Sequence, residues 1–116
     1  MKMSQRGLAG VIILDLEGRL ILGDGEQEFR DRVDELMKQG HMKILDNMNA
    51  VTYIDSAGVG MLAGKLKTLR ERGGDMKLLN LTSRGQRLFG MMKLHLVFET
   101  FDNEDLAAKS FAFRAR

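Results

Sequence analysis

The residues best placed to do chemistry are Asp55 and Ser56, which follow an apolar run over 51–54 and precede a segment with helical periodicity. A serine hydroxyl at the start of a helix is suited to carry a phosphate, because the first turn has free N–H groups and lies at the positive end of the helix dipole. Phosphorylation would add about −1.5 to −2 charges there. Asp55 would add like-charge repulsion, so an apolar partner would be excluded while the fold stayed intact. The alternative is that Asp55 or Ser56 is an ordinary helix N-cap.

The predicted helix after Ser56 has an unusual outer face. At about 100° per residue, one sector is apolar and should face a sheet; it contains Val59, Leu62, Ala63, Leu66 and Leu69. The opposite sector is small and flat instead of charged, and it contains Ala57, Gly60, Met61, Gly64 and Thr68. Glycine inside a helix costs about 1 kcal/mol relative to alanine, which suggests that another chain approaches this sector closely. We therefore predict that these five residues form a docking strip, with Met61 as an exposed, adaptable contact.

The sequence leaves open one alternative to this docking strip and offers one further candidate segment. A neighbouring loop of the same chain could cover the face instead. The turn over 23–25, just before the first predicted helix, is a weaker candidate for the rim of the docking surface.

Enzyme chemistry is poorly supported by the sequence. Residues 58–63 fit the pattern G-x-G-x-x-A, but a polar Asp-Ser pair precedes it and no acidic residue ends the next strand, so a nucleotide-binding enzyme is a remote alternative. Ile54 stands where a hydrolase elbow needs glycine. His41 and His95 lack spaced partners, and the chain has no cysteine, so we predict no catalytic residue, no cofactor and no metal site.

The remaining pattern predicts an α/β fold with a mixed sheet. Strands are expected over 11–14, 19–22, 43–48, 51–54, 76–81 and 96–101, with a turn at Gly18. Helices are expected over 26–38, 57–72, 83–93 and 103–113, with Asn103 as an N-cap. After an opening hairpin-like pair, strands alternate with helices, as in layered folds with a parallel section. The expected core residues are Val11, Ile13, Leu45, Met48, Val59, Leu62, Leu66, Met76, Leu78, Leu88, Met91 and Met92.

Length and composition fit one domain over 1–116, with 1–7 as a candidate disordered segment. The formal net charge is +2 and aromatic residues make up 6%, which argues against a nucleic-acid binder. No apolar run is long enough to span a bilayer, and no signal peptide is apparent, so a cytoplasmic location is expected. A bare sheet edge would allow a homodimer but does not require one.

The segment 54–60, Ile-Asp-Ser-Ala-Gly-Val-Gly, resembles the Asp-Ser-x-Gly-Leu/Val-Gly signature of anti-sigma factor antagonists. These proteins belong to the STAS group, named for sulfate transporters and anti-sigma factor antagonists. The resemblance covers most of the chain, since the order of the segments at 73–74, 77–80, 87–89, 94 and 97–98 also matches the family.

The resemblance implies a STAS-like domain with four or five strands and about four helices packed mainly on one face. It implies that Ser56 is phosphorylated by an anti-sigma factor that is a serine kinase, that Asp55 takes part in recognition, and that a phosphatase resets the protein. The unphosphorylated form would bind the anti-sigma factor and release a sigma factor. Many members have Ser or Thr where this chain has Ala57, so no second hydroxyl site is present. The alternative within the family is a scaffold or transporter-associated subunit that is never phosphorylated.

Overall fold

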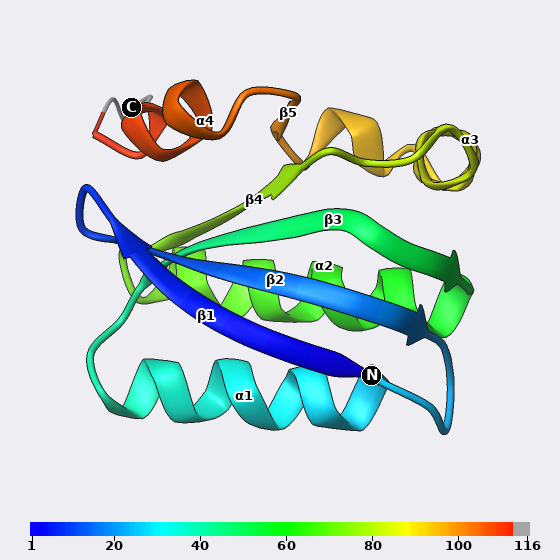
Figure 1. Ribbon diagram of the computed structural model, residues 1–116, viewed down its shortest axis with the longest axis horizontal. Helices are drawn as coiled ribbons and strands as arrows, with labels where there is room; N and C mark the ends of the chain where they lie inside the picture. The colour runs from blue at the N-terminus through cyan, green and yellow to red at the C-terminus, as the bar shows by residue number, and fades with distance from the viewer. Residues whose placement is uncertain (113–116) are drawn as a thin grey trace.

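The computed structural model describes residues 1–112 as a five-stranded mixed sheet with helices on both faces (Figure 1). The strand order is β1-β2-β3-β4-β5, and only β1 runs antiparallel to its neighbour. The strands are β1 (Lys2–Leu8), β2 (Val11–Leu20), β3 (Lys43–Ile54), β4 (Asp75–Leu79) and β5 (Thr100–Phe101). The helices are α1 (Glu26–Lys38), α2 (Ser56–Glu71), α3 (Ser83–Met91) and α4 (Glu104–Ser110), with a short 3₁₀ turn η1 (Leu94–Leu96). The predicted α/β class with a mixed sheet is confirmed.

The sheet has a large core on one face and a small core on the other. Helices α1 and α2 lie side by side below the sheet in Figure 1, whereas α4 lies above it. Phe29 of α1, Leu62 of α2 and Phe89 of α3 belong to the large core. The small core is formed by Val11, Ile13, Leu45, Leu79, Ala107 and Phe111. Most helices thus pack on one face, and the carboxyl ends of β2 and β3 lie next to the start of α2.

The N-terminal segment is ordered, so the expected disorder of residues 1–7 is wrong. Residues 2–8 form β1, which pairs with β2 along its whole length. The hairpin turn lies at Ala9 and Gly10, both with positive φ, and not at Gly18. Gly18 lies inside β2 at a register irregularity, so the two short strands expected over 11–14 and 19–22 form one strand, and Leu22 lies beyond its end.

Several other element boundaries differ from the predictions. The segments over 43–48 and 51–54 form one continuous strand, β3. The last strand is only Thr100–Phe101, because residues 94–96 form η1. Asn103 caps α4 as expected, accepting from the Leu106 N–H at 2.9 Å, but α4 ends at Ser110, and Phe113 lies outside the described residues.

The core prediction fails mainly at the end of α3. Met91 is 81% exposed and Met92 is 39% exposed, while Leu88 is half-buried. Helix α3 buries the face that carries Gly85 and Phe89. At about 100° per residue, Met91 lies on the opposite face, and Met92 follows the last residue of the helix. The core also contains two charged residues that the sequence did not indicate, Asp46 and Lys77.

Candidate functional site

Asp55 links two segments at the carboxyl end of the sheet. Its Oδ1 accepts a hydrogen bond from the backbone N–H of Gly58 at 2.8 Å, which makes Asp55 the N-cap of α2. Its Oδ2 accepts from the backbone N–H of Leu22 at 3.2 Å, in the loop between β2 and α1. The N-cap interpretation is therefore confirmed for Asp55, and the same carboxylate also fixes a loop 33 residues away in the sequence.

Ser56 is the first residue of α2 and is exposed. Its hydroxyl forms no hydrogen bond with any of residues 1–112. Helix geometry leaves the N–H groups of Ser56 and Ala57 without an intrahelical acceptor, whereas that of Gly58 is taken by Asp55. The hydroxyl is thus accessible, with two free N–H groups nearby.

The glycines of α2 serve two different purposes. A Cβ at Gly58 would lie 2.2 Å from the carbonyl oxygen of Leu20, so only glycine lets the start of α2 approach the end of β2 this closely. Gly60 and Gly64 are exposed, and a Cβ at either position would meet no described atom within 4 Å. The alternative that a loop of the same chain covers these two glycines is therefore wrong for the part of the chain that the structure describes.

Met61 was predicted to be exposed, and this is wrong. It is only 6% exposed and belongs to the large core. Lys65, one turn further along the same side of α2, binds Asp34 of α1. This side of α2 therefore faces α1, which covers the Met61 side chain. The remaining members of the docking strip are exposed or half-buried: Ala57, Gly60, Gly64 and Thr68.

Leu22 is a surface residue that the sequence reasoning missed. It lies in a tight turn closed by mutual hydrogen bonds of 3.0 Å between the backbones of Ile21 and Asp24. Its side chain is 71% exposed although it is apolar. Since Asp55 binds the Leu22 backbone, this side chain is held near the start of α2. Only the tertiary contact reveals it, since the sequence shows a leucine after an apolar strand.

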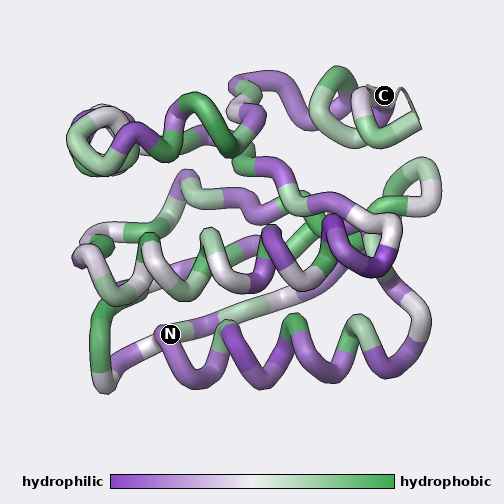
Figure 2. Tube along the Cα trace, turned by 180° about the vertical axis from the view of Figure 1, so that it is seen from behind, coloured by the Kyte–Doolittle hydropathy of each residue, from purple (hydrophilic) through white to green (hydrophobic). Residues whose placement is uncertain are grey.

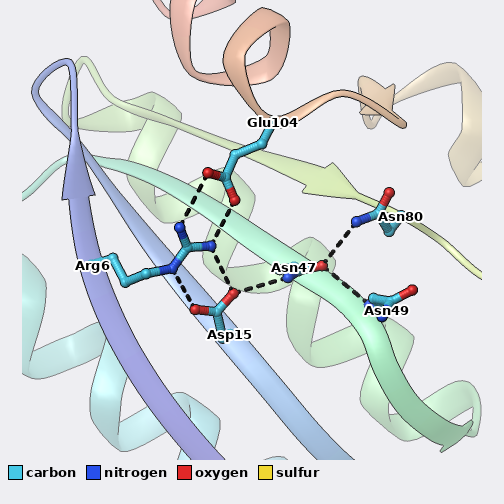
Figure 3. A network of polar contacts seen from close by, with 6 residues as sticks. All are labelled: Arg6, Asp15, Asn47, Asn49, Asn80 and Glu104. Atoms are coloured by element: carbon cyan, nitrogen blue, oxygen red, sulfur yellow. Dashed lines mark hydrogen bonds and ion pairs between the residues drawn. The ribbon is translucent and has the colours of Figure 1, made fainter.

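A second polar cluster lies on the opposite face of the sheet (Figure 3). Arg6 donates to both carboxylate oxygens of Asp15 and of Glu104, with shortest distances of 2.6 Å. These bonds lower the pKa of both carboxyl groups. Asn47 donates to Asp15 at 2.9 Å and accepts from Asn80 at 3.3 Å. This cluster joins α4 to β1 and β2, and we assign it a structural role.

The described residues contain no group of three or more His, Cys, Asp or Glu side chains that could hold a metal ion. Within residues 1–112, no helix has the length and apolar character required to cross a membrane.

Comparison with known proteins identifies relatives that are named as anti-sigma factor antagonists. The chain is 27% identical over 96 residues to an anti-sigma F factor antagonist of Paenibacillus polymyxa, covering 82% of this chain and 81% of the relative. It is 35% identical over 82 residues to an anti-sigma-B factor antagonist of Bacillus subtilis, covering 70% and 68%. These relatives are regulatory proteins rather than enzymes.

Solved structures share the fold. The Bacillus cell fate determinant SpoIIAA in its phosphorylated form superimposes with a TM-score of 0.71 at 23% identity, covering 93% of this chain and 97% of that one. An anti-sigma factor antagonist from Mycobacterium paratuberculosis gives a TM-score of 0.84 at 14% identity, covering 97% and 94%. The model of the STAS domain matches residues 2–107, and the chain therefore belongs to the STAS domain family.

Proposed function

We propose that this protein is an anti-sigma factor antagonist whose binding to an anti-sigma factor is switched off by phosphorylation of Ser56. The observation that carries the proposal is the state of Ser56, an exposed hydroxyl without a hydrogen-bond partner in residues 1–112, at the start of α2. The names of the curated relatives support the class of partner.

The unphosphorylated surface would present few obstacles to a partner. Around Ser56 it consists of Ala57, Gly60 and Gly64, with the exposed Leu22 at the rim. Small residues let a partner approach the α2 backbone closely, and Leu22 offers apolar area that the partner can bury.

Phosphorylation would act mainly at this interface. The added charge of about −1.5 to −2 meets only two free N–H groups, because Asp55 already occupies that of Gly58. The Asp55 carboxylate is adjacent in sequence and repels the phosphate. Burying a poorly compensated dianion against an apolar partner is costly, so the complex should dissociate while the domain stays folded.

The same proposal specifies the other partners. The anti-sigma factor is a serine kinase that modifies Ser56, a phosphatase removes the phosphate, and the sigma factor is released while the antagonist is bound. The protein would act in the cytoplasm by binding, without catalysis of its own and without direct contact with nucleic acid.

Intact-mass spectrometry is the first test. The protein is incubated with ATP and each anti-sigma kinase candidate encoded near its gene, and modified peptides are mapped. A single phosphate on Ser56 is expected. Binding without any modification would instead favour a constitutive scaffold.

A matched pair of variants tests the switch itself. Ser56→Asp should weaken binding to the anti-sigma factor by at least about tenfold, with little change in the unfolding midpoint. Ser83→Asp is the control, because Ser83 is also an exposed first residue of a helix with a side-chain cap before it. Equal losses from both variants would contradict a specific role for Ser56.

A further inference from the structure

Charged residues are unevenly distributed along the chain. Residues 56–98 contain eight Lys or Arg and two Asp or Glu, a formal charge of +6, whereas the rest of the sequence carries −4. Within residues 1–112, five of these cations are exposed and form no ion pair: Lys67, Arg72, Arg84, Arg87 and Lys93. The net charge of +2 is therefore a balance between a basic region, formed by α2, α3 and η1, and an acidic remainder.

The same region exposes apolar side chains. Met91 is 81% exposed and Leu96 is 77% exposed, while Met92 and Val97 are 39% and 40% exposed. Figure 2 shows a largely hydrophobic stretch following α3. A cluster of exposed apolar residues on a small domain often marks an interaction surface.

A groove connects this segment to α2. It has a volume of about 450 Å³ and is lined by Ala63, Leu66, Lys67, Arg70, Glu71 and Val97. Arg70 holds its two walls together, since its guanidinium donates to the Val97 carbonyl oxygen at 3.1 Å. The opposite side of α2 faces α1 through the pair of Lys65 and Asp34, so the groove opens away from α1.

We propose that this groove and the segment beside it bind an acidic amphipathic segment of a partner protein. We name the surface the basic apolar patch and define it as Lys67, Met91, Met92, Lys93, Leu96 and Val97. If the function proposed above is correct, the segment belongs to the anti-sigma factor, because Lys67 adjoins Gly60 and Gly64 on the exposed face of α2.

The chemistry of the patch specifies that of its ligand. The apolar side chains gain affinity by burial, and the two methionines can adapt to different shapes. A single exposed ion pair adds little affinity, but reversing the charges of several pairs replaces attraction by repulsion, and the pairs also orient the ligand and speed its association. A helix with leucines on one face and glutamates beside them meets both requirements, because its leucines can enter the groove while its carboxylates face the exposed cations of this region.

The test uses the full chain and two synthetic helical peptides, each four turns long. Both have leucines at positions i, i+3, i+4 and i+7; one has glutamate at the flanking positions and the other has lysine. Amide ¹H–¹⁵N chemical shifts are followed during titration. The glutamate peptide is expected to shift the signals of Lys67 and of residues 91–97, and the lysine peptide to bind at least about tenfold more weakly.

Charge-reversal variants then localise the site. The double variant Lys67→Glu/Lys93→Glu should weaken binding of the glutamate peptide about tenfold. The control is Leu106→Asp/Lys109→Glu on α4, which changes a 62% exposed leucine and an exposed lysine outside the patch and should have no effect. Equal binding of the two peptides, or shifts confined to another surface, would overturn the proposal.

Two further outcomes separate this proposal from others. Ser56→Asp should leave binding of the glutamate peptide unchanged, so failure of the phosphorylation switch and failure of the patch give different results. If dilution of the peptide-free protein moves the same signals, the patch binds a second copy of this chain, which would also overturn the proposal.

Discussion

Asp46 to valine is expected to increase the free energy of unfolding, although it changes the middle of the central strand. The Asp46 side chain is fully buried, and neither carboxyl oxygen has a hydrogen-bond partner among residues 1–112. Its direct neighbours in the sheet are Leu14 and Leu78, both in the large core. Among residues 1–112, the other buried charged side chain is Lys77, and its ammonium group is bound by Ser110 and Glu99. Valine is apolar, is closer to aspartate in size than leucine is, and suits a strand.

The expected gain in the free energy of unfolding of Asp46→Val has two parts. Removing a buried polar group without a partner should stabilise the protein by about 1–3 kcal/mol at any pH. Burial also raises the pKa of Asp46 well above its usual value. The unfolded chain therefore loses this proton at lower pH than the folded protein does. The stability that the wild type gains by keeping this proton is fully present below about pH 3.9, the pKa in the unfolded chain. Above that pH, the free energy of unfolding of the wild type falls by up to about 1.4 kcal/mol per pH unit until the pH reaches the folded pKa.

The assay is urea denaturation between about pH 4.5 and pH 7.5 for the wild type, Asp46→Val and Asp46→Asn. The advantage of Asp46→Val over the wild type should grow with pH, and Asp46→Asn should share the changed pH dependence while keeping the cost of the buried polar group. Asp102→Asn, at an exposed aspartate, is the control and should run parallel to the wild type. If Asp46→Val is less stable than the wild type, or if all four curves are parallel, the carboxyl group has a partner or stays ionised, and the reasoning is refuted.

Two further predictions concern the start of α2. Asp55→Ala should reduce the free energy of unfolding by about 1–2 kcal/mol through loss of the helix cap, and hydrogen exchange should show faster exchange at Leu22; an unchanged Leu22 amide would contradict the linking role of the carboxylate. Gly58→Ala should destabilise the fold, because its Cβ would lie 2.2 Å from the Leu20 carbonyl oxygen, whereas Gly60→Ala should stabilise it by up to about 1 kcal/mol in urea denaturation. Similar effects of the two alanines would show that α2 does not approach β2 as described.

Much of the site could be predicted because it depends on local features. The Asp-Ser pair follows a strand and begins a helix, and capping involves only the residues of the first helical turn. The periodicity of α2 correctly places Val59, Leu62 and Leu66 in the core, since a helix that packs on a sheet must bury its apolar sector. The predicted α/β fold with a parallel section follows from the alternation of strands and helices, whereas the packing of the helices mainly on one face was implied by the family resemblance.

The predictions of side-chain burial were wrong where a neighbouring helix or strand determines whether a side chain is exposed. Helical angle placed Met61 opposite the sheet, but α1 widens the buried sector of α2 beyond the part that faces the sheet. Met91 and Met92 were assigned to the core because the face of Leu88 was predicted to be the buried one, whereas the structure buries the face of Gly85 and Phe89. In both cases the missing information was the position of another element, which periodicity does not contain.

By itself, the sequence determined the four helices and their alternation with strands after residue 26, the identity of the candidate switch residue Ser56 and the cap beside it, because each depends on residues that are close together in the chain. Only the tertiary structure decided that Asp55 also fixes the Leu22 loop, that Asp46 lies in the core without a hydrogen-bond partner in the described part of the chain, and that Val97 lies beside α2. These three facts depend on contacts between residues distant in sequence, and such contacts exist only once the sheet has set its strand order and register.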